Sequence, residues 1–267
     1  MKYFLRFLCF LLPLCLAVSA GAEGIKFTDI EPGKEYAINL KKVAELKGSD
    51  YESLFYRLAQ GSATDGEYAY VAALRRNVNG GLFKVDLKDW SVVNMVYGLD
   101  FGHANDLVFN TKKNELYAVF LDRPHSQKLV RIDPDTLEIT GEVELSFPFY
   151  AVSYNETRDQ YAFGRGGGYT IVLTDGDFNY LKLLPGVNTG LARQGMDCDD
   201  KYIYFLHWDS KNHKSQMMVY DWDGHHINTI KINNYIEVES MFHIGDDYYI
   251  TFLSNYPRIY KATLVEQ

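Results

Sequence analysis

The chain has 267 residues and carries 27 basic and 35 acidic side chains, a formal net charge of −8. This acidic balance excludes a general nucleic-acid binder, which needs a basic footprint. Aromatic residues make up 15% of the chain, which favours strands because aromatic side chains fit a pleated, half-buried surface.

The N-terminus has the pattern of an export signal. Lys2 and Arg6 give a basic start, residues 7–18 are mostly apolar, and Ala20-Gly-Ala22 offers small residues for cleavage. We predict that residues 1–22 are a signal peptide and that the protein is secreted or periplasmic. A retained anchor is the alternative, although the apolar run is shorter than the roughly 20 residues that span a bilayer. Cleavage would leave no transmembrane segment and a charge of 25 − 35 = −10.

The chain between residues 107 and 145 shows four short strands joined by turns. Residues 107–109 and 116–121 are apolar strands separated by a polar turn, and residues 128–133 and 137–145 alternate polar and apolar side chains. Four antiparallel strands joined by tight turns make one blade of a β-propeller.

This unit is repeated five times along the chain. A turn, an aromatic residue and an apolar strand recur around Tyr70, Tyr117, Tyr161, Tyr204 and Tyr249, which are 47, 44, 43 and 45 residues apart. A fixed period in this range indicates a radial array. We therefore predict an all-β fold, a five-bladed β-propeller of four-stranded antiparallel blades.

The fifth unit ends after three strands, at Gln267. Residues 35–40 form a spare strand candidate before the first full unit. We predict that this N-terminal strand completes the last blade and closes the ring, because an unpaired sheet edge invites aggregation. Residues 23–267 would then form one domain, expected to be a monomer.

Two short phrases resemble known propeller repeats. Residues 130–139, Val-Arg-Ile-Asp-Pro-Asp-Thr-Leu-Glu-Ile, resemble a unit of the YVTN type, and residues 219–224, Val-Tyr-Asp-Trp-Asp-Gly, resemble the blade turn of NHL propellers. The resemblance implies a β-propeller repeat protein and carries no function with it.

The loops of such a ring divide between two faces. The turns after the innermost strands, among them Asp65-Gly-Glu67 and Gly245-Asp-Asp247, are short and acidic, and we expect a solvated face there. The opposite loops gather Arg, His, Trp and Tyr, and loops on a rigid scaffold commonly carry binding residues.

Polar residues precede nearly every innermost strand and should face the central channel. Together with the basic loops they form the predicted ligand-binding set: His103, Asn105, Asp106, Tyr150, Arg193, Gln194, Trp208, Glu237, Glu239, Arg75, Arg123 and Arg258. Aromatic platforms with a few convergent polar groups are ordinary pocket design, and arginine favours carboxylate or phosphate. A water-filled channel whose polar groups satisfy one another is the structural alternative.

The predicted function is non-catalytic binding of an extracellular or cell-surface saccharide, peptide or anionic small molecule. One alternative is a docking platform for another protein. Another is a glycoside hydrolase using Asp106, Asp197 and Glu239, since hydrolysis needs two carboxyls roughly 5–10 Å apart. We expect no catalytic residue and no cofactor, although oxygen atoms of Asn105, Asp106, Glu237 and Glu239 would suit calcium at the channel mouth.

Overall fold

The structure is a computed structural model, and it describes residues 24–47, 58–74, 80–120, 127–166, 168–254 and 256–267. The predicted signal peptide lies outside these ranges. Within them the chain is built almost entirely of strands, with one short 3-10 helix, η1 (Phe27–Asp29), before the first strand. None of the described helices has the length and apolar character needed to cross a membrane.

Three sheets have the predicted four antiparallel strands, each in chain order from the inside outward. The first contains β2 (Leu58–Thr64), β3 (Tyr68–Leu74), β4 (Gly80–Asp86) and β5 (Val92–Leu99). The second contains β6 (Leu107–Asn110), β7 (Glu115–Phe120), β8 (Lys128–Ile132) and β9 (Ile139–Glu144). The third contains β10 (Phe149–Asn155), β11 (Gln160–Arg165), β12 (Ile171–Asp175) and β13 (Tyr180–Leu184).

The fourth sheet differs from the prediction because it has eight strands in the order β14-β15-β16-β17-β1-β20-β19-β18. Its members are β14 (Ala192–Cys198), β15 (Tyr202–Asp209), β16 (Lys214–Asp221), β17 (His226–Ile232), β18 (Val238–Ile244), β19 (Asp247–Phe252), β20 (Arg258–Glu266) and β1 (Tyr36–Glu45). The N-terminal strand β1 pairs antiparallel with β20 along its whole length. It also lies parallel to β17 at Ala37 and Ile38, and this short contact joins two sets of four strands.

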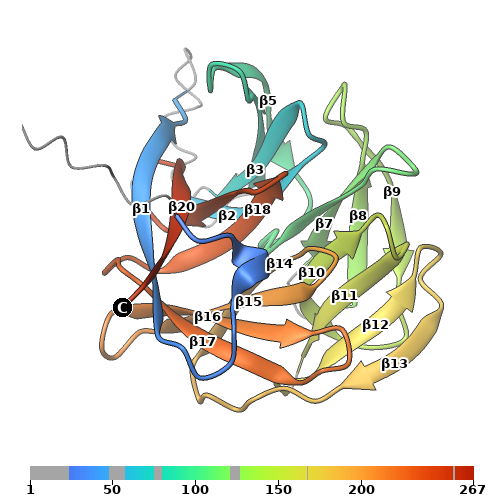
Figure 1. Ribbon diagram of the computed structural model, residues 1–267. Helices are drawn as coiled ribbons and strands as arrows, with labels where there is room; N and C mark the ends of the chain where they lie inside the picture. Colours follow the sequence, from blue (N-terminus) through green and yellow to red (C-terminus); the bar gives the residue numbers. More distant parts are fainter. Residues whose placement is uncertain (1–23, 48–57, 75–79, 121–126, 167, 255) are drawn as a thin grey trace, which may run out of the picture.

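The innermost strands form a closed cycle. Strand β2 contacts β6, β6 contacts β10, β10 contacts β14, β14 contacts β18, and β18 contacts β2. Figure 1 shows the sheets arranged radially around β10, β14 and β18. The chain is a β-propeller repeat protein.

The repeated sequence phrase has a physical basis in the turn after each innermost strand. In four of the units an Asp or Asn is the last residue of the innermost strand or directly follows it. Its side-chain oxygen accepts a hydrogen bond from the backbone N–H three residues later. The acceptors are Asp65, Asn110, Asn155 and Asp199, at N···O distances of 2.6, 2.9, 2.7 and 2.8 Å. Such Asx turns give the chain a fixed reversal at the end of each strand.

The tyrosines of the repeat are buried and tied to these turns. Tyr70 and Tyr204 donate their hydroxyls to Asp65 and Asp199, and the Tyr161 hydroxyl accepts from Asn110 at 2.6 Å. All three are fully buried. A buried hydroxyl is tolerated because it is hydrogen-bonded, so the aromatic residue and the turn residue stabilise each other.

Candidate functional site

The centre of the ring is held by Asp106, which lies just before β6 and is fully buried. Its Oδ2 accepts hydrogen bonds from the backbone N–H of Val152 at 3.0 Å and of Met196 at 2.9 Å. Its Oδ1 accepts from Leu107 N at 3.1 Å and from the Ser240 hydroxyl at 2.7 Å. Asp106 and these four donors are called the hub below.

The hub connects all five innermost strands. Its four donors come from β6, β10, β14 and β18, and the Ser240 hydroxyl in turn accepts from Ser62 N of β2 at 3.0 Å. Burial raises the pKa of Asp106 to about 8, although the hydrogen bonds from the four donors lower it. The side chain of Asp106 thus gives a shared hydrogen-bond acceptor to backbone groups that converge on the axis.

Small residues make room for this carboxylate. The positions equivalent to Asp106 in the other units are Gly61, Ala151, Gly195 and Ser240, so the five lie 45, 45, 44 and 45 residues apart. A Cβ on Gly61 would lie 2.4 Å from the Asp106 carbonyl carbon, and one on Gly195 would lie 2.8 Å from Asp106 Oδ1. Only glycine fits at these two positions, because any side chain would collide with the hub.

The residues that directly precede the hub positions are polar and together form a ring around the axis, as the sequence predicts. All five are buried: Gln60, Asn105, Tyr150, Gln194 and Glu239. Neighbouring strands pair within it. Asn105 Nδ2 donates to the Tyr150 carbonyl at 2.8 Å, and Gln194 Nε2 donates to Glu237 Oε1 at 2.8 Å. Burial raises the pKa of Glu239, and the nearby Glu237 adds to the shift.

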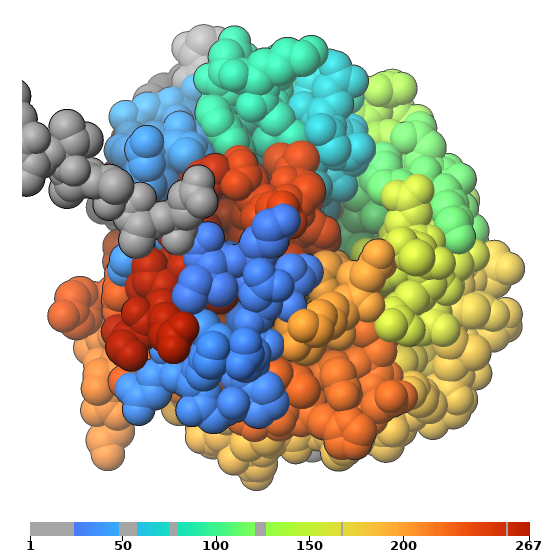
Figure 2. All heavy atoms as spheres, in the orientation of Figure 1, coloured from blue at the N-terminus to red at the C-terminus, as the bar shows by residue number. Residues whose placement is uncertain are grey.

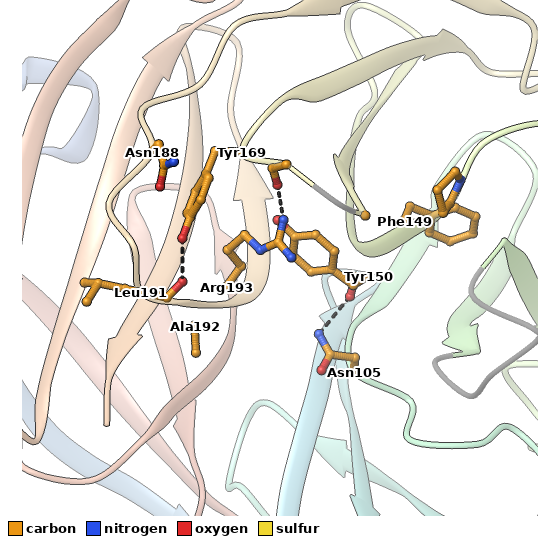
Figure 3. A pocket seen from close by; sticks show the side chains of 11 residues that line it. Asn105, Phe149, Tyr150, Tyr169, Asn188, Leu191, Ala192 and Arg193 are labelled. Atoms are coloured by element: carbon orange, nitrogen blue, oxygen red, sulfur yellow. Dashed lines mark hydrogen bonds between the residues drawn. The ribbon is translucent and has the colours of Figure 1, made fainter. Parts of the chain in front are cut away.

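A cavity of about 770 Å³ lies on this side of the hub, between the third sheet and the start of β14. It is called the Arg193 pocket and is lined by Asn105, Pro148, Phe149, Tyr150, Gly166, Gly168, Tyr169, Asn188, Leu191, Ala192 and Arg193. Figure 3 shows Arg193 reaching between Tyr169 and Tyr150, with Asn105 below Tyr150 and hydrogen-bonded to its carbonyl. Three predicted residues, Asn105, Tyr150 and Arg193, therefore meet in one cavity.

Arg193 is held in place by several contacts. Its guanidinium carbon lies 4.3 Å from the ring centre of Tyr150 and 5.2 Å from that of Tyr169. Its Nη1 donates to the carbonyls of Gly168 and Arg165. Cation–π contacts with two rings and backbone acceptors orient the guanidinium before any ligand arrives.

The aromatic walls of the pocket present polar groups. The Tyr169 hydroxyl donates to the Leu191 carbonyl at 3.0 Å. The Tyr150 hydroxyl is buried without a hydrogen bond that meets the usual geometric criteria, and the positive charge of Arg193 acts on it. The remaining lining residues give the pocket apolar surface from Phe149, Pro148 and Leu191. Among the described lining residues, Arg193 is the single ionised side chain, so the pocket is positive in an acidic protein.

Comparisons with known proteins assign the chain to no family. No family model matches the chain, and no curated protein matches it. Among solved structures, the chain is similar to the β-propeller domain of Cps50 (Swd1) from Myceliophteria thermophila, with 11% identity and a TM-score of 0.45. The match covers 83% of this chain and 99% of that domain.

The remaining predicted residues lie elsewhere. Trp208 is buried in β15 with its ring 5.9 Å from His213, so it offers no exposed platform. Arg258 Nε donates to Glu45 Oε2 at 2.8 Å, which ties β20 to β1. His103 is exposed and lines neither the Arg193 pocket nor the cavity on the other side of the hub. Arg75 and Arg123 lie outside the described residues.

The structure also brings residues into the pocket that the sequence did not single out. Tyr169 lies in the loop between β11 and β12, and Asn188 lies in the loop between β13 and β14. His207, fully buried beside Tyr169, binds the Thr189 hydroxyl through Nδ1 at 2.8 Å. Burial and then Arg193 lower the pKa of His207 to about 4, so it is neutral and leaves Arg193 as the positive group. The repeat itself gave no signal for these positions.

The described residues contain no group of three or more His, Cys, Asp or Glu side chains placed to hold a metal ion. Both oxygens of Asp106 already accept hydrogen bonds from the protein. Calcium binding by Asn105, Asp106, Glu237 and Glu239 therefore has no support from the arrangement of these groups.

Proposed function

We propose that this protein is an exported, non-catalytic β-propeller that binds an anionic extracellular ligand in the Arg193 pocket. Export rests on the basic and apolar pattern of residues 1–22. Binding rests on one observation: a guanidinium held between two tyrosine rings is the single ionised group among the described lining residues. Its planar fork matches a carboxylate.

We further propose that the ring has five blades. The eight-stranded sheet then counts as two blades that meet at the parallel β1–β17 contact, which is only two residue pairs long. The closed cycle of five innermost strands supports this count. In this scheme β18, β19, β20 and β1 form the last blade, and the N-terminal strand closes the ring.

The ligand should carry a carboxylate next to a surface that can lie on an aromatic ring. Tyr169 and Tyr150 offer such rings, and Asn105 and Asn188 offer amide groups for hydroxyl or peptide partners. An acidic saccharide or an acidic peptide meets this description. A saccharide ring that carries a carboxylate combines both features in a small volume, as the cavity requires.

The hydrolase alternative receives no support from the positions of its three carboxylates. Asp106 is committed to the hub, and neither Asp197 nor Glu239 lines the Arg193 pocket. Asp197 lies after the hub position in its strand, whereas Glu239 lies before it. Two carboxyls facing one bond are therefore not found among the described residues that line this cavity.

The proposal is tested with paired ligands and paired variants of residues 23–267. Glucuronate and galacturonate are compared with glucose and galactose, and acetyl-glutamate amide with acetyl-glutamine amide, by thermal shift and calorimetry. We expect an acidic member to bind and its neutral parent to bind about tenfold more weakly or worse, because a charge-assisted hydrogen bond contributes about 1.5–3 kcal/mol.

Arg193→Gln should weaken that binding by about ten- to a hundredfold. The matched control is Arg158→Gln. Arg158 also lies over an aromatic ring, at 4.9 Å from Trp222, and also donates to a backbone carbonyl, but it lies outside the pocket. Equal binding of acidic and neutral ligands, or full binding by Arg193→Gln, would contradict the proposal.

A further inference from the structure

A second cavity, of about 590 Å³, lies on the other side of the hub. It is lined by parts of all five innermost strands that follow the hub positions, and by Thr28 of η1. Figure 2 shows the blue N-terminal segment spread over the middle of the face that carries η1. This is the face on which the sequence predicts acidic, solvated turns. The space is called the acidic cavity below.

Most of the charged side chains around the acidic cavity are negative. Its described lining residues include six acids and one histidine, which are Asp65, Glu156, Asp197, Asp199, Asp200, Asp246 and His243. Asp65 and Asp199 are committed to their turns and tyrosines, and Asp246 binds the ammonium of Lys26 at 2.7 Å. That leaves Asp197, Asp200 and Glu156 with carboxylate oxygens that have no described partner.

Asp197 and Asp200 each use one carboxylate oxygen in a hydrogen bond within the protein. Asp197 uses Oδ2 to accept from His243 at 2.8 Å, and Asp200 uses Oδ1 to accept from Asn155 at 3.0 Å. Asp200 and Glu156 are exposed at the rim, whereas Asp197 is mostly buried deeper inside. A ligand entering from the rim would therefore meet carboxylates at two depths.

Two buried hydroxyls also line this cavity. Ser62 is 1% exposed and Ser153 is 3% exposed, and neither Oγ has a hydrogen-bond partner among the described residues by the usual criteria. The group beside Ser153 is the thiol of Cys198, a weak donor. Buried hydroxyl groups normally have a hydrogen-bond partner. Because these two oxygens have none among the described residues, they can accept a hydrogen bond from a ligand.

The groups present suit an organic cation better than a metal ion. No set of three metal-binding side chains is found among the described residues. Burial lowers the pKa of His243, but Asp197 outweighs it and raises the value to about 9, so the imidazole is protonated and cannot bind a metal. Phe109, Tyr154 and Phe242 add aromatic surface, on which an ammonium group is stabilised.

We propose that the acidic cavity is a second binding site, for an aliphatic primary ammonium group held by Asp200, Asp197 and the Ser153 hydroxyl. The Lys26–Asp246 contact on the same face shows this pairing within the chain itself. The ammonium could belong to a free polyamine or to a lysine side chain, and the test separates these sources. The site is independent of the Arg193 pocket.

The test is calorimetry on residues 23–267 with two probes, spermidine and the blocked tripeptide Gly-Lys-Gly. Wild type should bind at least one of them, and the stronger probe identifies the source. Magnesium chloride at matched ionic strength should not displace the probe. Absence of binding to both probes, or displacement by magnesium at matched strength, would overturn the proposal.

Variants locate the binding. Asp200→Asn leaves the His243–Asp197 pair intact and should weaken binding by about tenfold or more, since it removes a charged acceptor. Glu156→Gln and Ser153→Ala serve as second variants should Asp200→Asn fail to fold. The control is Asp177→Asn, an exposed acid in the turn between β12 and β13. Unchanged binding in Asp200→Asn and Glu156→Gln, or equal loss in Asp177→Asn, would overturn the assignment.

Discussion

Asp106 illustrates how one residue can organise a whole ring. Its two oxygens receive three backbone N–H groups and one hydroxyl from four different strands. A buried N–H without a partner costs about as much as a lost hydrogen bond. The carboxylate therefore stabilises the centre by giving each converging strand a shared acceptor, and a ligand has no free atom of Asp106 to contact.

Asp106→Asn should destabilise the protein although it preserves shape. Whichever oxygen becomes an amide nitrogen, its hydrogens will face a backbone N–H that now has no acceptor. We expect the free energy of unfolding to fall by at least about 1–3 kcal/mol, measured by urea denaturation. Asp223→Asn, whose side chain is 77% exposed, is the control. An unchanged denaturation midpoint for Asp106→Asn would show that the hub is not stabilising.

His243 gives the protein a pH-dependent contribution to stability. Its Nδ1 lies 2.8 Å from Asp197 Oδ2, and although burial lowers the pKa of His243, Asp197 raises it to about 9. The folded state then binds a proton more tightly than the unfolded state, whose histidine titrates near 6.5. The contribution is complete below pH 6.5 and is lost as the pH rises through about 9.

The measurement is the difference in unfolding free energy between wild type and His243→Gln across that pH range. Taking this difference removes the parallel effect of Asp106, whose pKa is raised to about 8 and whose contribution also declines with rising pH. The difference should shrink by at most about 3 kcal/mol between pH 6.5 and 9. A difference that is constant with pH would mean that the pair does not shift the titration of His243.

At the scale of single elements, β1 is the clearest case of a strand predicted from the sequence. The spare alternating segment at residues 35–40 and the missing fourth strand at the C-terminus together indicated the pairing, and β1 does pair with β20. The parallel contact with β17 could not be predicted, because nothing in the alternation of residues 35–40 shows which neighbour lies beyond. The Asx turns were missed for another reason. Asp occupies that position in two units and Asn in two others, so a comparison of residue types does not show that the side chains make the same hydrogen bond.

Ile38→Ala tests the closing strand. Ile38 is fully buried, and its backbone pairs with Ile232 of β17 and Leu264 of β20. We expect a loss of about 2–5 kcal/mol in the free energy of unfolding, from lost apolar contact and the resulting cavity. Lys41→Ala, on the same strand but exposed, is the control and should stay near wild type. Equal stability of the two variants would mean that β1 is not part of the cooperative fold.

At the scale of the whole molecule, the hub separates two regions of opposite charge. Residues before the hub positions lead to the Arg193 pocket, and residues after them lead to the acidic cavity. Three residues of the Arg193 pocket could be predicted because they lie at or near the same repeat position, where an innermost strand begins. They are Asn105, Tyr150 and Arg193. Tyr169 and Asn188 could not, because they lie in loops outside the repeated sequence phrase. The burial of Asp106 depended on glycines in other units.

The most direct test of the central claim is a crystal structure of residues 23–267 with the acidic ligand that binds best in the paired screen. Our account predicts ligand density in the Arg193 pocket, with the carboxylate against the Arg193 guanidinium and the body of the ligand on Tyr169 or Tyr150. An empty pocket in that crystal, with the ligand bound elsewhere on the ring, would contradict it.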